Sequence, residues 1–288
     1  MISIVGIGTG ASSIAEKFND FSQYNIYVLN DKVKKSAGKK RKLKSFDSPE
    51  EYEQNVPDLK NYFSKLDDRV QVFVIGSSYS SNYTLGILQQ IKNKKIDLFY
   101  IKPDTTLLTG IPRLIENMTF GVLQEYARSG LINSITLISN KNLEQVIGDV
   151  PIKKFYDHLN SSIVSVVHYL NYFEHNEPEI GVMATPAEAS KVRTIGILDA
   201  LRIEEKWLFD LDMPREVCYY LCINKEKLEN DGSLHKRVVD ILKEKPRNAF
   251  RKVSYAIYET EHGKDFGFVV AHTNAIQQQN TLDKFDQE

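Results

Sequence analysis

The first half of the chain alternates short apolar runs with helical patterns, and this alternation constrains the fold more than any other feature. Five runs are almost continuously apolar, at 2–5, 25–29, 70–75, 97–101 and 132–138. Such runs are typical of strands in a sheet that is covered on both faces. Helical patterns lie between them, at 11–18, 80–92 and 111–126. We therefore predict an α/β fold with a doubly wound parallel sheet, whose ligand crevice lies beyond the carboxyl ends of its strands.

Two helical patterns also predict which face is buried. Within 111–126 the apolar side chains that repeat at helical spacing are Ile111, Leu114, Ile115, Met118, Val122 and Tyr126, and we expect this stripe to face the core. A longer pattern runs from Ile152 to about Glu174, with Pro151 at its entry and Pro178 beyond its end. Apolar positions cover much of its circumference, which predicts a long central helix.

The last hundred residues have a different pattern. Strands are indicated at 192–201, 216–223, 252–259 and 266–272, with a helix at 233–243 and a hairpin turn at 261–264. This pattern predicts a smaller α+β C-terminal domain built on a mixed sheet. We expect an α/β domain at 1–150, a central helix at 151–177, an α+β domain at 178–275 and a flexible tail at 276–288.

Composition narrows the function classes. The chain has 37 Lys and Arg against 38 Asp and Glu, a net charge of −1, and 42% apolar residues. This balance argues against a uniformly basic nucleic-acid binder and against a disordered acidic protein. No apolar run approaches the roughly 18–20 residues that a bilayer requires, and the first residues already read as a strand. Cys218 and Cys222 lack metal-ligand spacing, so we expect buried thiols in a cytoplasmic protein without a metal centre or membrane contact.

A glycine-rich turn, Gly6-Ile-Gly8-Thr-Gly10-Ala11, separates the first strand from the first helix. Glycines there let the backbone approach a phosphate, and the helix N-terminus supplies free N–H groups. Alone, the turn also fits a dinucleotide fingerprint, with Asp31 as a partner for a ribose hydroxyl, so an NAD-dependent oxidoreductase stays open. Any tight strand-to-helix turn can use glycine as well.

The third predicted strand leads into a loop of small residues, Gly76-Ser-Ser-Tyr79-Ser-Ser-Asn-Tyr-Thr-Leu-Gly86. With the glycine turn, Asn140 after the fifth strand and the long helix, this order of elements resembles the tubulin/FtsZ superfamily over residues 1–275. Segment 192–195 resembles the family's stretch just beyond the loop that follows its central helix, and segment 265–273 resembles its closing strand. The compact length and the acidic end of the tail are similar to phage- or plasmid-type relatives.

The resemblance implies a site for GTP or GDP with Mg²⁺. Its phosphates would lie on the first glycine turn and on the loop after the third strand, formed here by Gly6, Gly8, Thr9, Gly10, Ala11, Gly76, Ser77, Ser78, Ser80 and Ser81. The second loop is glycine-rich in the family and serine-rich here, so the chain departs from the pattern. The ring of Tyr79 would also lie in this loop, where the family places phosphates. Tyr156 would stack on the guanine, while Asn160 and Asn140 would read its edge. Both residues also have a structural interpretation: Asn140 would cap the helix that follows it, and Tyr156 would pack against neighbouring side chains.

The resemblance also implies head-to-tail filaments, in which a neighbouring subunit supplies the acid for hydrolysis. The matching segment is Thr185-Pro-Ala-Glu188-Ala-Ser-Lys191, where only Glu188 aligns with a catalytic acid. The same segment is typical of a helix start, with Thr185 as N-cap and Pro186 next. We therefore expect hydrolysis to be weak or lost. The alternative is a structural or adaptor protein on the same fold that does not hydrolyse nucleotide, with or without binding it.

Residues 32–44 carry a dense positive charge. The eight basic residues of this basic loop are Lys32, Lys34, Lys35, Lys39, Lys40, Arg41, Lys42 and Lys44. The loop could neutralise nucleotide phosphates, or contact an acidic partner or nucleic acid. A solvated loop, neutralised by the acidic residues between 47 and 58, is equally compatible with the sequence.

Overall fold

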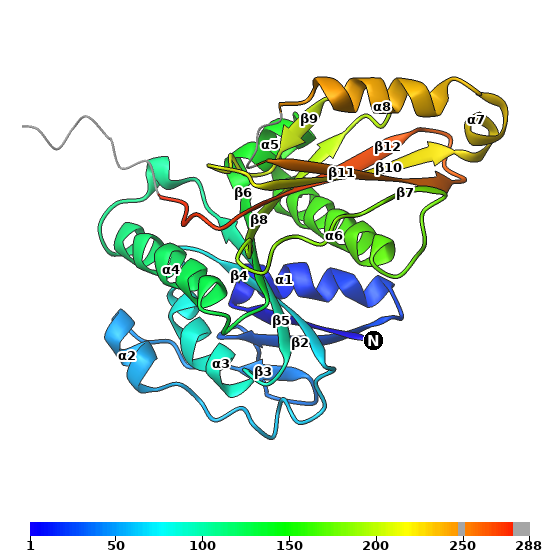
Figure 1. Ribbon diagram of the computed structural model, residues 1–288. Helices are drawn as coiled ribbons and strands as arrows, with labels where there is room; N and C mark the ends of the chain where they lie inside the picture. Colours follow the sequence, from blue (N-terminus) through cyan, green and yellow to red (C-terminus); the bar gives the residue numbers. More distant parts are fainter. Residues whose placement is uncertain (247–250, 279–288) are drawn as a thin grey trace, which may run out of the picture.

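The computed structural model describes residues 1–246 and 251–278, and in that part all the strands belong to one sheet (Figure 1). The strand order is β3-β2-β1-β4-β5-β6-β8-β12-β10-β11-β7, and β9 pairs with β8. The strands of the first half are β1 (Ile2–Ile7), β2 (Tyr24–Asn30), β3 (Lys40–Lys42), β4 (Arg69–Ile75), β5 (Lys95–Lys102) and β6 (Ser134–Ser139). They pair in parallel, which confirms the predicted doubly wound sheet.

The second half contributes six strands, largely antiparallel. They are β7 (Ile180–Val182), β8 (Val192–Leu198), β9 (Glu205–Trp207), β10 (Glu216–Asn224), β11 (Lys252–Thr260) and β12 (Phe266–Thr273). β8 pairs with β6 in parallel and so continues the sheet of the first half. The short strands β3, β7 and β9 carry too few residues for periodicity to predict them.

Eight α-helices and four 3₁₀ turns are present in the described residues. The helices are α1 (Thr9–Lys17), α2 (Pro49–Gln54), α3 (Thr84–Gln90), α4 (Ile111–Arg128), α5 (Asn140–Ile147), α6 (Phe155–Phe173), α7 (Lys225–Asn230) and α8 (Leu234–Glu244). The turns are η1 (Phe18–Asp20), η2 (Tyr79–Tyr83), η3 (Thr105–Leu107) and η4 (Ile152–Lys154). The predicted central helix is confirmed as η4 followed by α6.

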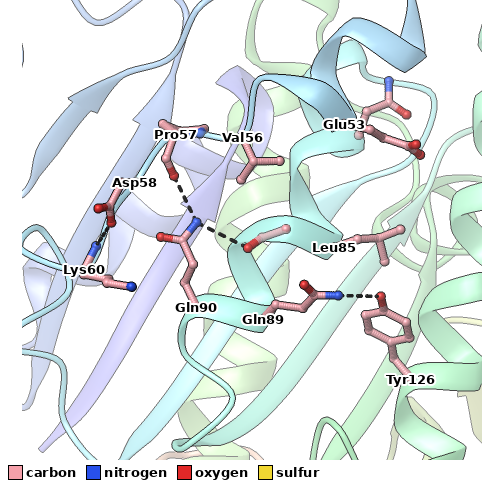
Figure 2. Close-up of a pocket in the computed structure, with 11 residues that line it drawn as sticks. Glu53, Val56, Pro57, Asp58, Lys60, Leu85, Gln89, Gln90 and Tyr126 are labelled. Carbon is pink, nitrogen blue, oxygen red and sulfur yellow. Dashed lines mark hydrogen bonds between the residues drawn. The ribbon is translucent and has the colours of Figure 1, made fainter.

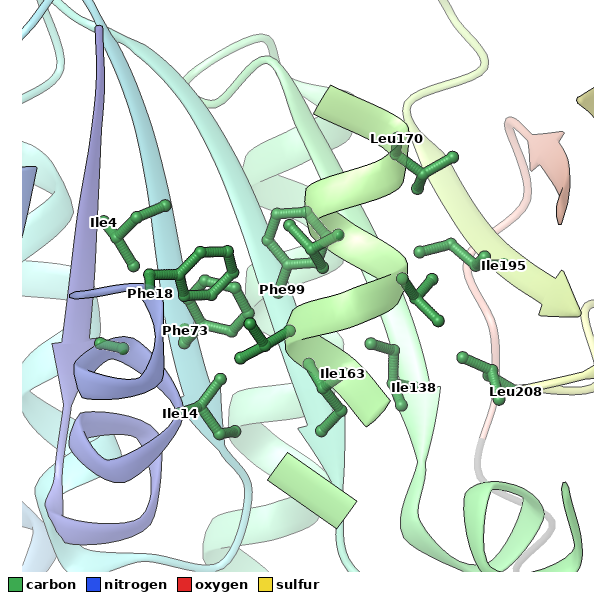
Figure 3. Close-up of a cluster of buried hydrophobic side chains, with 14 of the residues drawn as sticks. Ile4, Ile14, Phe18, Phe73, Phe99, Ile138, Ile163, Leu170, Ile195 and Leu208 are labelled. Atoms are coloured by element: carbon green, nitrogen blue, oxygen red, sulfur yellow. The ribbon is translucent and has the colours of Figure 1, made fainter. Parts of the chain in front are cut away.

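The largest core lies between the sheet and the two helices α1 and α6 (Figure 3). Ile14 and Phe18 contribute to it from the α1 side, and Ile163 from α6, against Phe73 and Phe99 on the sheet. The Lys17 ammonium also lies 2.6 Å from the Asp157 carboxylate and joins α1 to α6. α6 packs on residues from both halves of the sheet, because Phe268 and Val270 belong to the same core.

Two further cores cover the remaining sheet surface. Helices α3 and α4 pack on the opposite face of the first-half strands, through Ile87, Leu88, Phe120 and Leu123. α8 covers the second half through Leu234, Val238 and Leu242. Strand residues alternate between the two faces, so both faces of the sheet are buried, as the continuous apolar runs predicted.

The predicted apolar stripe of α4 is largely exposed, which corrects the sequence analysis. Leu114 is 56% exposed and Met118 is 58% exposed, whereas Glu116 is fully buried. The side chain of Ile111 lies outside the described residues. Of the stripe residues whose side chains are described, only Ile115 is buried, and the buried face continues through Phe120 and Leu123. Helical spacing predicted an apolar stripe, but tertiary packing buries the polar residue Glu116 and leaves Leu114 and Met118 facing solvent.

The predicted hairpin at 261–264 is also wrong. β11 and β12 are not neighbours, because β10 lies between them and pairs with β11 in parallel and with β12 antiparallel. The short connection therefore crosses the end of β10. A turn signal identifies a chain reversal, but it does not state which strands pair.

Cys218 and Cys222 are buried free thiols on β10, as expected, and burial raises the pKa of both. Gln277 lies in the segment predicted to be a tail, yet it is 2% exposed and exchanges hydrogen bonds with Gln124 of α4. Residues 279–288 lie outside the described residues. No helix in the described part is long and apolar enough to cross a membrane.

Candidate functional site

The glycine turn joins β1 to α1 at the carboxyl edge of the sheet. Gly8 has φ +91°, a left-handed conformation that favours glycine, and its N–H donates to the Leu29 carbonyl. Gly6 lies so close to the start of α1 that a Cβ would be 2.5 Å from the Ala11 carbonyl oxygen. Thr9 and Gly10 are exposed at the first turn of α1. The turn thus presents the free N–H groups of a helix N-terminus to the crevice.

The serine loop, residues 77–81, closes onto this turn. A Cβ at Gly8 would lie 3.3 Å from the Ser80 Cβ and 3.5 Å from the Ser78 Oγ. The Tyr79 ring turns away and packs on Tyr52 of α2, with ring centroids 6.1 Å apart. The structure therefore places two hydroxyl-bearing residues directly beside the glycine turn, and the Tyr79 ring outside it.

A buried carboxyl beneath the serine loop was not predicted. Glu116 of α4 accepts a hydrogen bond from the Tyr100 hydroxyl at 2.6 Å and another from the Ser77 N–H. A Cβ at Gly76 would lie only 1.7 Å from a Glu116 oxygen. Burial raises the pKa of Glu116, and the Tyr100 bond and the Lys102 charge oppose that shift. No sequence signal distinguishes Glu116 from the other polar residues of α4.

Lysines gather beside the start of α1. A hollow of about 580 Å³ is lined by Asp31, Lys32, Lys42, Leu43, Lys44 and Ser45. The Asp31 carboxylate accepts hydrogen bonds from the hydroxyls of Thr9, at 3.1 Å, and Ser45, at 3.3 Å. The basic loop therefore brings positive charge to the glycine turn, and Asp31 links the two.

The residues expected to contact a base lie on α5 and α6. Asn140 is the first residue of α5, but the cap is Ser139, whose Oγ accepts the Asn142 N–H, so the idea that Asn140 caps the helix is wrong. Tyr156 is 72% exposed at the start of α6, and Asn160 lies one turn further along. Among the described residues, no hydrogen bond joins these three side chains to the glycine turn.

Residues 185–191 form no helix, which corrects the prediction of a helix start there. Glu188 is exposed in a turn between β7 and β8. The Ala187 N–H donates to both oxygens of Glu216, at 3.0 and 2.9 Å, and so ties this loop to β10. A distant carboxylate thus takes the N–H that an N-cap would have bound, which local sequence did not indicate.

Two other hollows have polar walls. One, of about 530 Å³, lies at the ends of β5 and β6 and mixes cations with anions, including Lys102, Arg113, Asp104 and Asp210. The other, of about 580 Å³, lies between α3 and the segment after α2 (Figure 2). Its Gln90 amide donates to the Pro57 carbonyl and accepts the Leu59 N–H, so this side chain holds a loop in place. No group of metal-binding side chains occurs among the described residues.

Solved structures with the same architecture exist, although no family model and no curated protein matches the sequence. A GTPγS-form protofilament of TubZ from Bacillus thuringiensis serovar israelensis aligns with a TM-score of 0.70 at 11% identity, covering 96% of this chain and 87% of that one. An FtsZ dimer from M. jannaschii gives 0.62 at 12%, with 94% and 88% covered. GDP-bound CetZ1 from Haloferax volcanii gives 0.65 at 12%, with 95% and 94% covered. The chain therefore has the tubulin/FtsZ fold, in a highly divergent sequence.

Proposed function

We propose that this chain is a tubulin/FtsZ-like cytoskeletal protein that binds GTP or GDP and associates head to tail, with weak or no hydrolysis. In this proposal residues 1–150 hold the nucleotide, and the central helix at 151–177 links them to the α+β part at 178–275. The observation that carries the proposal is that Ser78 and Ser80 lie beside Gly8 of the glycine turn, next to a lysine-lined hollow.

The residues at this turn fit the phosphates of a nucleotide. The α1 N-terminus offers N–H groups and a favourable dipole, and the hydroxyls of Ser78 and Ser80 can donate to phosphate oxygens. Lys42 and Lys44 supply opposite charge. Asp31 would hold the Mg²⁺ that accompanies a nucleotide, since Mg²⁺ prefers carboxylate oxygen.

The base and the catalytic acid belong to separate parts of the proposal. Tyr156 would stack on the guanine, and Asn140 and Asn160 would bind its edge. Glu188, which is exposed and carried by a loop without helical structure, would be the only acid delivered to a neighbouring subunit. One carboxylate on such a loop supports slow turnover at most.

Thermal unfolding with GTP, GDP, ATP and NAD, each with Mg²⁺, tests the binding step. A ligand at 100 times its Kd adds about 2.7 kcal/mol to the stability of the native state. We expect GTP and GDP to raise Tm by several degrees. The triple variant Lys32→Gln, Lys42→Gln, Lys44→Gln should lose the shift, and Lys236→Gln on α8 should retain it. Stabilisation by NAD alone would instead favour the oxidoreductase.

Light scattering and electron microscopy with GTP test the assembly step. Filaments should form above a critical concentration, and phosphate release should be slow and should fall further in Glu188→Gln. Rapid release that is unchanged in Glu188→Gln would contradict the proposed role of Glu188.

A second candidate is a structural or adaptor protein on the same fold that binds no nucleotide. It is favoured by the serine loop, which has side chains where the resemblance implies glycine, and by Pro186, which replaces the Asn that the resemblance implies in the segment with Glu188. Filaments that assemble equally well without nucleotide, together with no thermal shift, would support this alternative.

A further inference from the structure

A hollow of about 810 Å³ lies where the second half of α6 meets β11 and the segment that follows β11. Aromatic rings form much of its wall, namely Phe21, Tyr169, Tyr172, Phe173, Tyr258 and Phe266. Four carboxylates lie on it as well, namely Glu177, Glu179, Glu259 and Glu261. We call it the α6–β11 pocket, and its lining contains no lysine or arginine among the described residues.

Three of these carboxylates have no cation in the described part of the chain. Glu259 lies 3.5 Å from the Lys225 ammonium, whereas Glu177, Glu179 and Glu261 are exposed and form no ion pair with any described residue. Aromatic faces and carboxylates both attract cations, and aromatic walls also pack against an alkyl stem. The pocket therefore fits lysine side chains.

The basic loop offers such side chains. Lys34 and Lys35 are exposed and form no ion pair within the described residues. The acidic residues that follow do not neutralise them there. The Glu51 carboxylate, for example, accepts the Ser48 N–H in the capping box of α2. The positive charge of the loop is thus available to another molecule.

The pocket lies near the amino end of β2, and the first residues of the basic loop follow its carboxyl end, before the chain returns to pair β3 with β2. Phe21 of the pocket precedes the amino end of β2. Seven strand residues span about 20 Å. In Figure 1 the chain start, marked N, lies on the same side as the end of α6 near β7. A loop at one end and a pocket at the other can pair between copies that repeat along this direction, which gives an open-ended heterologous contact.

We propose that lysines of the basic loop of one copy dock in the α6–β11 pocket of the next copy, where Glu177, Glu179 and Glu261 receive them. This inference rests on the proposed self-association and adds the contact that sets the register of the assembly. The occupant is a second copy of this chain because the chain itself carries both the unpaired cations and the unpaired carboxylates.

A labelled synthetic peptide of residues 32–44 tests the pocket directly, by fluorescence anisotropy with the full chain. We expect saturable binding that weakens at least tenfold in Glu177→Lys with Glu261→Lys. The matched control reverses Glu226 and Glu229 of α7, which are also exposed, and should change binding less than twofold. Equal loss in both variants would mean unspecific attraction and would overturn the proposal.

Sedimentation of the full chain tests the contact in the assembly. Lys34→Glu with Lys35→Glu, and Glu177→Lys with Glu261→Lys, should each raise the critical concentration at least tenfold, and their combination should restore it to within threefold of wild type. Filaments that tolerate both pairs would refute the contact while leaving the proposed function intact. Peptide binding without any filaments would refute the proposed assembly, and with it the docking between copies.

Discussion

His272 makes the stability of the fold depend on pH in a way that can be calculated. It lies on β12 at 9% exposure, opposite Glu216 and beside Arg193, and its ring N–H donates to the Ser190 carbonyl. Burial, reinforced by the Arg193 charge, lowers its pKa to about 3, against the Ser190 bond. Glu216 bonds Ala187 and His272 bonds Ser190, so these two side chains also anchor the loop that carries Glu188.

The sign follows from the two protonation states. Below pH 6.5 the unfolded chain binds a proton at His272, while the folded chain keeps the ring neutral down to about pH 3. Stability is therefore complete above pH 6.5 and falls as the pH decreases through this window. The loss approaches about 1.36 kcal/mol per pH unit, so lowering the pH from 7.5 to 5.0 removes about 2 kcal/mol.

Guanidinium chloride unfolding at 25 °C and both pH values measures this loss in wild type and in His272→Asn. The variant should be less stable at pH 7.5, because it leaves a small cavity, but its further loss at pH 5.0 should be about 2 kcal/mol smaller than that of wild type. His272→Gln should behave in the same way. If wild type and both variants lose equal stability between the two pH values, His272 is not buried in its neutral form and the reasoning fails.

Two substitutions test the packing around the candidate site. Gly76→Ala should destabilise by about 2–3 kcal/mol in chemical unfolding, because its Cβ overlaps Glu116, whereas Gly121→Ala, which meets open space on α4, should be neutral or slightly stabilising; equal effects would refute the overlap. Gln277→Ala should cost about 1–3 kcal/mol because the Gln277 side-chain amide accepts the Asp212 N–H and donates to the Ala275 carbonyl, whereas the bonds of Gln124 to the Gln277 backbone remain; a change below 0.5 kcal/mol would contradict this side-chain pairing.

The sheet, the long helix and the glycine turn could be predicted because their signals are local. A strand buried on both faces needs a continuous apolar run, and the run at 70–75 therefore predicts β4. A turn packed closely against a helix needs glycine, and Gly8 therefore predicts the left-handed turn before α1. Pairing is not local. The position of β10 between β11 and β12 depends on residues far apart in sequence, and a turn motif at 261–264 contains none of that information.

The α4 helix shows the same limit for side chains. Periodicity gives the angle between residues but not the direction of the core, and on α4 the buried positions include Glu116 and Gln124. Each is satisfied by a partner from elsewhere, Tyr100 on β5 and Gln277 near the end of the described chain. Because a buried polar residue is tolerated only with such partners, a sequence without the fold cannot reveal it.

The serine loop keeps its shape without the glycines that the family resemblance led us to expect. Ser77 has φ +59°, which costs a residue with a Cβ about 1–2 kcal/mol relative to the right-handed conformation. Glu116 accepts the Ser77 N–H, and one hydrogen bond of this kind contributes about as much. Glycine stays at Gly76, where a Cβ would overlap Glu116, and at Gly8, where φ is +91°. The carboxyl of Glu116 beneath the loop thus offsets the strain of a left-handed serine, and glycine occupies the two positions where this carboxyl or the backbone conformation disfavours a Cβ.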